Sequence, residues 1–154
     1  MSTSKVRKYI KENNIKAEIF EHPGKEGLTS KQAATIHKIG TEKIVKTLFF
    51  ADENGKQVII IIQGNKKVDP QKIPNLNKAR LANPSNLRNQ LGYEPGGLPP
   101  IALPENITKL VDKGVTEQNL VVGSAGSRHS GIKLKPQDIV NQPNTKVLDL
   151  AKKQ

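Results

Sequence analysis

The chain has 154 residues, no cysteine, five aromatic residues other than histidine and a formal net charge of +11. This length suits one domain with a single core, and the lack of cysteine excludes disulfides, thiolate zinc sites and a cysteine nucleophile. The three histidines, His22, His37 and His129, do not have metal-ligand spacing, so we expect neither a metal nor another cofactor. The positive charge favours a polyanionic partner, nucleic acid before an acidic membrane surface.

The ends and apolar runs of the sequence indicate where the protein acts. The N-terminus has no apolar stretch behind its charges, as a signal peptide would. No apolar run approaches the roughly 20 residues that span a bilayer. We therefore expect a cytoplasmic protein, folded as a single domain over residues 1–154, without a membrane partner.

The first third of the chain is predicted to contain two helices and a strand. Residues 3–14 place apolar residues at helical spacing between basic ones, which predicts an amphipathic helix. A short strand over 17–20 follows. The second helix is predicted over 30–37, because Thr29-Ser30-Lys31-Gln32 resembles a capping box and Gly40 can end it.

A β-hairpin is predicted next. Apolar runs over 44–50 and 58–62 flank a polar turn that contains Asn54-Gly55, and both turn residues tolerate positive φ. The second run, Val-Ile-Ile-Ile-Ile, is typical of a strand buried on both faces. Lys46 interrupts the first run, where an ammonium is costly to desolvate. Either its stem carries the charge to the surface, or it faces a pocket that requires a positive charge.

The remainder of the chain is predicted to alternate short elements with loops. In order we expect a short helix from Pro70, a strand over 78–81, a helix over 86–91 ended by Gly92, a strand or helix over 107–112, strands over 119–122 and 132–135, a helix from Pro136 and an amphipathic segment over 147–153. Because helices and strands are interspersed irregularly, the fold class is predicted to be α+β with a mixed or mostly antiparallel sheet.

Two loops are rich in glycine. Residues 92–100 contain three Gly and three Pro, and they form either a plain connection or a backbone wall that a ligand can approach closely. Residues 123–131 form a small-residue loop whose N–H groups can cradle an anion, although the loop fits neither a P-loop nor a dinucleotide fingerprint. Ser124 and His129 lie in this loop, but a serine nucleophile also needs an orienting carboxylate and a fixed geometry.

Four segments, taken in order, resemble the YbaK/ProX family of free-standing aminoacyl-tRNA deacylases, which are related to the editing insertion domain of bacterial prolyl-tRNA synthetases. They are IVKTLFF, an apolar strand with GNKKVD, LGYEPGGLPPIAL and VVGSAGSRHSGIKLKPQDIV. The likeness covers residues from about 4 to 151. It implies a compact domain whose mixed, largely antiparallel sheet curls into a partial barrel with surrounding helices. It also implies hydrolysis, in trans, of the ester that joins a wrong amino acid to a tRNA.

The resemblance also implies site residues. The family's lysine falls on Lys46, and its G-x-x-x-P loop falls on residues 96–100. We expect Lys46 to bind the 3′-terminal phosphate or to polarise the ester, and the N–H groups of Gly96 and Gly97 to hold the carbonyl or the water. The expected substrate-binding residues are Phe20, His22, Thr47, Leu98, Pro100, Gly123, Ser124, Gly126 and His129. The expected partners are the acceptor end of a tRNA and an aminoacyl-tRNA synthetase.

Departures from the family pattern leave the substrate amino acid open. Phe20 stands where some members have Tyr. Thr47 stands where members that act on alanyl-tRNA tend to have Asn, and Thr at this position is closer to the branch that acts on cysteinyl-tRNA. Cys and Ala on a prolyl tRNA both remain candidates, as do water and substrate-assisted attack. Two other interpretations are a non-catalytic tRNA-binding or regulatory module of this fold, and a small-molecule hydrolase that uses Ser124 and His129.

Overall fold

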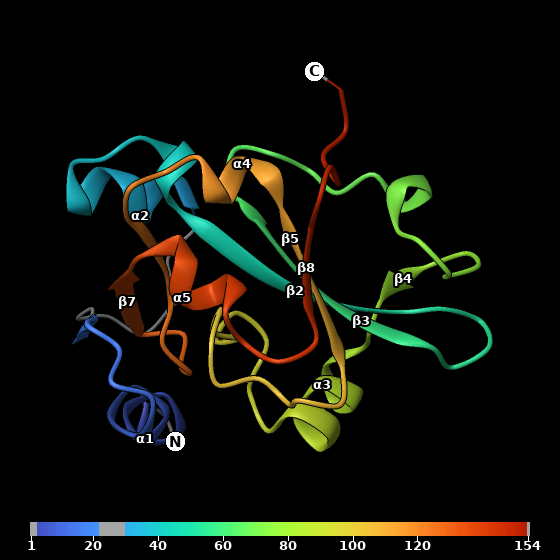
Figure 1. Ribbon diagram of the computed structural model, residues 1–154, viewed down its shortest axis with the longest axis horizontal. Helices are drawn as coiled ribbons and strands as arrows, with labels where there is room; N and C mark the ends of the chain where they lie inside the picture. The colour runs from blue at the N-terminus through green and yellow to red at the C-terminus, as the bar shows by residue number, and fades with distance from the viewer. Residues whose placement is uncertain (1–2, 22–29, 154) are drawn as a thin grey trace.

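The computed structural model describes residues 3–21 and 30–153, which form two β-sheets with helices around them (Figure 1). The elements in chain order are α1 (Ser4–Glu12), β1 (Glu18–Glu21), α2 (Ser30–His37), η1 (Thr41–Lys43), β2 (Val45–Ala51), β3 (Gln57–Gln63), η2 (Pro70–Lys72), β4 (Arg80–Leu81), α3 (Pro84–Leu91), β5 (Thr108–Asp112), α4 (Lys113–Thr116), β6 (Val121–Ser124), β7 (Ser130–Leu134), α5 (Pro136–Val140) and β8 (Thr145–Leu148).

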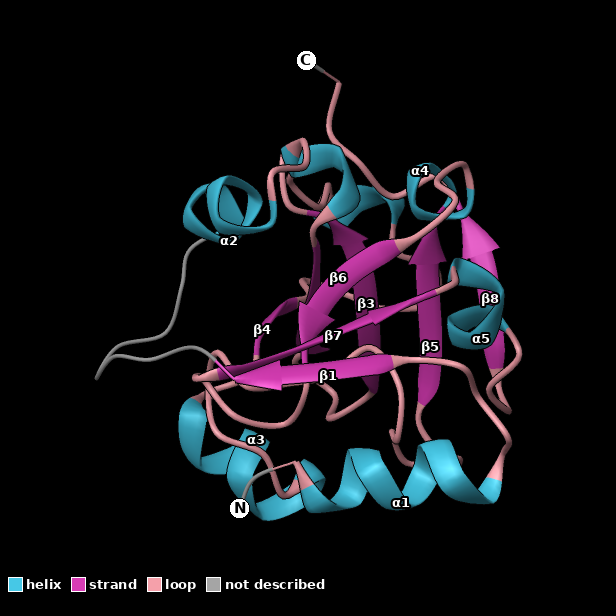
Figure 2. Ribbon diagram, turned by 90° about the vertical axis from the view of Figure 1, so that its left-hand side faces the viewer, coloured by secondary structure: helices cyan, strands magenta, loops and turns pink. Residues whose placement is uncertain are grey.

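The strands confirm the α+β class and the mixed sheet. One sheet has five strands in the order β4-β2-β3-β5-β8, and the other has three in the order β1-β7-β6. Among the described residues, β3–β5 and β5–β8 are parallel pairs, and the other four pairings are antiparallel. Within residues 3–21 and 30–153 the two sheets do not close into a barrel, and an isolated parallel bridge between Ile44 and Val122 joins them. In Figure 2 the three-stranded sheet crosses in front of β3 and β5.

Strand β3 is buried on both faces, as its run of β-branched residues predicts. Side chains alternate across a strand, so its apolar residues enter two different cores. Ile59 and Ile61 belong to the core between the two sheets, which also contains Ile132 of β7. Ile60 and Ile62 belong to a second core on the other face of the five-stranded sheet. All four isoleucines are 0 % exposed, so the β2–β3 hairpin is the centre of the molecule.

Local signals set several element boundaries. Helix α2 covers the predicted residues, and its proposed cap at Thr29 lies outside the described residues. At the start of α3 the Asn83 side chain accepts a hydrogen bond from Asn86 N at 2.8 Å. At its end Gly92 has a φ of 75°, a value that glycine adopts at little cost. None of the described helices is long and apolar enough to cross a membrane.

Two predicted segments differ from the structure. The helix expected from Pro70 is a single 3₁₀ turn, Pro70–Lys72, since Pro74 removes a backbone donor shortly afterwards. The final amphipathic segment, predicted over 147–153, instead begins inside an edge strand, β8, which pairs in parallel with β5. Its Val147 is 40 % exposed. An edge strand with exposed apolar residues carries little local signal, because its pairing comes from residues distant in sequence.

Candidate active site at the open edge of β2

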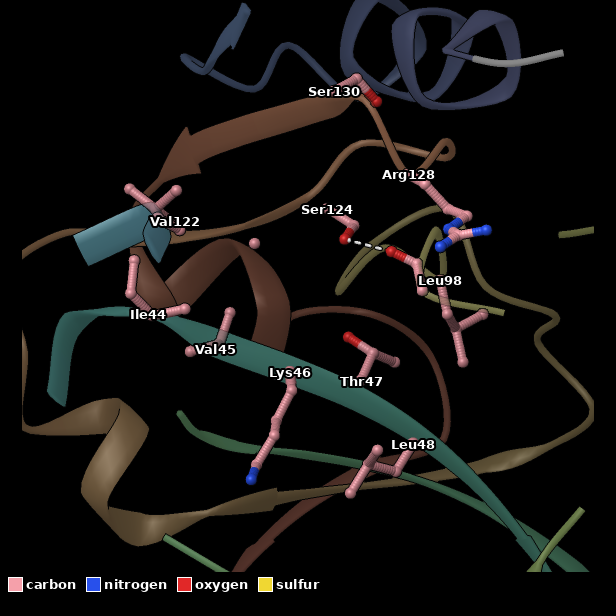
Figure 3. Close-up of a pocket in the computed structure, with 13 residues that line it drawn as sticks. Ile44, Val45, Lys46, Thr47, Leu48, Leu98, Val122, Ser124, Arg128 and Ser130 are labelled. Carbon is pink, nitrogen blue, oxygen red and sulfur yellow. Dashed lines mark hydrogen bonds between the residues drawn. The ribbon is translucent and has the colours of Figure 1, made fainter. Parts of the chain in front are cut away.

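A pocket of about 230 Å³ lies where β2 and β6 separate (Figure 3). Strand β4 pairs with β2 only at Phe50 and Ala51, and β6 meets the β2 end of the sheet at the Ile44–Val122 bridge. Between these points the outer edge of β2 borders the pocket, which we call the Lys46 pocket. Its lining residues are Ala33, Ile44, Val45, Lys46, Thr47, Leu48, Gly96, Leu98, Val122, Gly123, Ser124, Arg128 and Ser130.

Both glycine-rich loops border this pocket, and a hydrogen bond connects them. The Ser124 hydroxyl donates to the Gly96 carbonyl at 2.9 Å. A Cβ at Gly123 would lie 3.0 Å from Val45 Cγ2 and 3.3 Å from Pro100 Cδ, so a larger residue there would push the loop away from β2. The structure therefore brings together six of the predicted site residues: Lys46, Thr47, Gly96, Leu98, Gly123 and Ser124.

Thr47 presents its side chain and its main chain to the pocket. Its side chain points toward Leu98 and Ser124 (Figure 3), and its Oγ1 is buried with no hydrogen-bond partner in the described part of the chain. Along β2, Ile44 O accepts from Gly64 N on the β3 side, and Phe49 O accepts from Ala82 N on the opposite side. Main-chain groups alternate sides along a strand, so the Thr47 N–H and C=O face the open edge.

Lys46 lines the same pocket, but its ammonium extends from the opposite side of β2 (Figure 3). Adjacent residues of a strand point to opposite faces, so the Lys46 ammonium and the Thr47 side chain lie on different sides of β2. Burial lowers the pKa of Lys46 below its usual 10.5, and the positive charge of Lys67 lowers it further.

Two residues of the G-x-x-x-P loop have structural roles here. The Gly97 N–H donates to the Glu94 carbonyl at 2.9 Å, so the expectation that it holds the substrate is corrected. A Cβ at Gly97 would lie 3.0 Å from Ser127 Cα, which shows how closely the two loops pack. Pro100 packs behind Gly123 and does not line the pocket.

Of the four remaining predicted residues, three lie outside this pocket. The Phe20 ring packs against His37, with 4.4 Å between ring centroids, and belongs to the small apolar cluster behind the pocket wall. Gly126 and His129 line a neighbouring pocket. His22 lies outside the described residues. Phe20, which we expected to bind the substrate, therefore packs behind the pocket wall and does not line the pocket.

The structure does not form the serine–histidine pair of the hydrolase interpretation. The Ser124 hydroxyl donates to a carbonyl, and His129 lines a different pocket. A serine nucleophile must instead donate to a base that takes its proton. Among the described residues there is also no cluster of three or more His, Asp or Glu that could hold a metal ion.

The sequence did not single out Arg128 and Ala33 as lining residues. Arg128 had one signal, its place at the end of a glycine-rich loop, where a cation can complement an anion. Ala33 had none, because only the packing of α2 brings it to the pocket. Chemically, the site is a small pocket whose lining includes main-chain donors, the hydroxyls of Thr47, Ser124 and Ser130, and the two cations Lys46 and Arg128.

The fold and the pocket define a class of small α+β domain with a pocket where its two sheets separate. The family follows from comparison of sequences. Residues 24–141 match the aminoacyl-tRNA editing domain, so the chain belongs to the aminoacyl-tRNA editing domain family, as its resemblance to YbaK/ProX proteins implies.

Individual relatives agree with this family. YwhH of Bacillus subtilis (strain 168), whose function is uncharacterized, is 28 % identical over 155 residues, which cover 99 % of this chain and 98 % of YwhH. EbsC of Enterococcus faecalis (strain ATCC 700802 / V583), named as a Cys-tRNA(Pro)/Cys-tRNA(Cys) deacylase, is 25 % identical over 126 residues, or 79 % of this chain and 77 % of EbsC. The crystal structure of hypothetical protein APE2540 has a TM-score of 0.86 and 28 % identity, and the match covers 96 % of this chain and 99 % of that one.

Proline–tRNA ligases match over part of their length. The ligase of Streptococcus suis (strain 05ZYH33) is 31 % identical over 100 residues, which cover 62 % of this chain and 16 % of the ligase. The chain thus corresponds to one segment of a much larger synthetase.

Proposed function

We propose that the protein is a trans-editing hydrolase that removes a wrong amino acid, Cys or Ala, from a prolyl tRNA. The observation that carries the proposal is the pocket that Lys46, Thr47, Gly96 and Ser124 share at the open edge of β2. Membership of the editing family and the name of the relative EbsC support the same reaction. A prolyl-tRNA synthetase is the proposed second partner, because such ligases contain a related segment.

The proposed reaction begins with the aminoacyl ester bound between β2 and the glycine loops. The Thr47 N–H at the open edge and the Gly96 N–H donate to the ester carbonyl oxygen and stabilise the negative charge that develops there. Water adds to the carbonyl carbon, the bond to the ribose oxygen breaks, and that oxygen takes a proton that the water loses. The products are a free amino acid and an intact tRNA, and no metal ion takes part.

Other residues position the substrate. The Ser124 oxygen, held by its bond to Gly96, can accept a hydrogen bond from the α-amino group. Leu98 and Ala33 limit the room for the amino-acid side chain in a pocket of about 230 Å³. Substrate binding draws the Lys46 ammonium around the open edge, where its charge stabilises the ester oxygens.

A Lys46→Ala variant tests the proposal. Loss of the cation should lower kcat/KM for deacylation by about 100-fold to 1000-fold, the usual effect of removing one stabilising group from such a site. The measurement is release of free amino acid from tRNA charged with Ala, Cys, Ser or Pro, with circular dichroism to verify the fold. Lys56→Ala, in the exposed hairpin turn, is the matched control and should keep full activity.

Two results would reject the proposal. If Lys46→Ala deacylates at the wild-type rate, the assigned role of the lysine is wrong. If the wild-type protein binds the charged tRNAs but releases none of the four amino acids, the protein is a binding module of this fold instead.

A further inference from the structure

A second pocket adjoins the Lys46 pocket and shares one residue with it. This pocket, of about 470 Å³, is lined by Tyr93 and Glu94 on one side and by the segment from Gly126 to His129 on the other. We call it the Tyr93 pocket. Arg128 lines both pockets and stands at their common border. An amino-acid side chain such as that of Ala or Cys would occupy little of this volume, so the pocket suits a larger group of the same substrate.

Arg128 is the unpaired cation at this border. Its side chain is exposed and lies against Gly96, where a Cβ would be 3.4 Å from Arg128 Cγ. In the described part of the chain no carboxylate forms an ion pair with it. Arg88, the other arginine of the Tyr93 pocket, is paired with Glu94 at 3.1 Å. The charge of Arg128 therefore lies between the pockets, and a second cation is close by, because the Lys5 ammonium lies over the Tyr93 ring, 4.9 Å from its centroid.

The lining of the Tyr93 pocket suits a flat, uncharged ring. Tyr93 is buried and donates its hydroxyl hydrogen to Ala102 O at 3.0 Å, and burial raises its pKa to about 12, so the phenol remains neutral. The half-buried His129 ring forms part of the opposite wall, and its Nδ1 has no hydrogen-bond partner within residues 3–21 and 30–153. Aromatic side chains beside positive charges are typical of sites that stack nucleobases and hold the adjoining phosphates.

We propose that the Tyr93 pocket is a nucleobase subsite for the penultimate nucleotide of the substrate, and that Arg128 binds the phosphodiester joining this nucleotide to the terminal adenosine. The inference rests on the proposed function, since it places the aminoacylated adenosine in the Lys46 pocket. An arginine guanidinium can bind a phosphate with two parallel hydrogen bonds, which fixes its geometry. In Figure 3 the Arg128 side chain lies beside Leu98, at the edge of the Lys46 pocket.

The test compares minimal substrates that differ by one nucleotide. Alanyl and cysteinyl esters of adenosine and of the dinucleotide CpA are hydrolysed by the wild type, and KM is measured for each. Stacking of one base and one phosphate contact should make KM for the dinucleotide lower by about 10-fold or more. Arg128→Gln and His129→Ala should each bring the ratio of the two KM values, adenosine ester over dinucleotide ester, closer to one. Arg80→Gln, which removes an exposed arginine from β4, is the matched control and should keep it.

The outcomes separate this proposal from the proposed function. If the wild type hydrolyses both esters with the same KM, the subsite is wrong and the deacylase function stands. If His129→Ala changes the preference between alanyl and cysteinyl adenosine while the dinucleotide ratio is unchanged, the pocket holds the amino acid and the subsite is again wrong. If no ester and no charged tRNA is hydrolysed, both proposals fail.

Discussion

Lys46 and Thr47 are adjacent in sequence, yet they extend from opposite sides of β2 (Figure 3). This alternation gives the pocket a hydroxyl and a main-chain donor on one side of the strand and a cation on the other. The cation shares its surroundings with Lys67, and burial and this second charge both favour its neutral form. A small change in the burial of Lys46 or in the charge near it should therefore change the fraction of Lys46 that is protonated.

The lowered pKa of Lys46 predicts the pH dependence of deacylation. If the ammonium form is required, kcat/KM should fall as the pH rises through the lowered pKa, which lies below 10.5. Lys67→Gln removes a neighbouring cation, so it should raise the pKa of Lys46 and move the fall to higher pH. The measurement is a pH profile of kcat/KM, corrected for spontaneous ester hydrolysis, with Lys56→Gln as control. Identical alkaline limbs in Lys67→Gln and the wild type would contradict this coupling.

The lowered pKa of Lys46 also affects the stability of the fold, and stability changes with pH in the direction opposite to activity. Between the lowered pKa of Lys46 in the folded state and its higher pKa in the unfolded chain, the unfolded chain binds more protons. The free energy of unfolding contributed by this residue therefore rises with pH across that window. Activity and stability should thus change in opposite directions on the alkaline side.

Elements with strong local signals were predictable, and those that depend on distant partners were not. The hairpin follows from two apolar runs and an Asn-Gly turn, and α3 follows from an Asn cap and a terminal glycine. Strand β8 and the division into two sheets depend on pairing between segments far apart in sequence.

The same limit applies to the site. Thr47, Gly96 and Ser124 were expected together and lie together, because the family motif carries them. The motif alone does not reveal that Gly97 donates to Glu94, or that His129 lines a second pocket. Those facts depend on how two loops pack against each other.

Asp112 connects three elements and gives a prediction about stability. At the end of β5, its buried carboxylate accepts from Gly114 N of α4 at 3.1 Å and from Leu150 N after β8 at 2.8 Å. Asp112→Ala leaves two N–H groups buried without partners, so it should lower the free energy of unfolding by about 2–4 kcal/mol. Asp112→Asn, which keeps one acceptor oxygen, should lose about half as much. Urea denaturation measures both.

Asp149 supplies the control for this prediction. Its ion pair with Lys72 spans 3.4 Å, and its side chain is 53 % exposed. Asp149→Ala should therefore change the free energy of unfolding by less than about 1 kcal/mol. Equal losses in the Asp112 and Asp149 variants would show that the buried hydrogen bonds do not hold the C-terminal segment.

The whole molecule carries a net charge of +11, which predicts how it binds RNA. If this charge holds the acceptor stem, the affinity for tRNA should fall with salt, with a log–log slope of about −0.9 for each duplex phosphate contacted. KM for an aminoacyl adenosine, which has no phosphate, should change little with salt. Equilibrium binding and kinetics at several salt concentrations measure the two quantities. If the affinity for tRNA does not change with salt concentration, the basic surface does not hold the acceptor stem.

The bridge between Ile44 and Val122 has a mechanical consequence. One side of the Lys46 pocket is built on the five-stranded sheet and the other on the three-stranded sheet, and the two share this bridge next to the pocket. A slight tilt of one sheet about that point would widen or narrow the opening without breaking either sheet. Substitutions at Ile44 or Val122 should therefore alter which amino acids are accepted, although neither residue carries a group that takes part in hydrolysis.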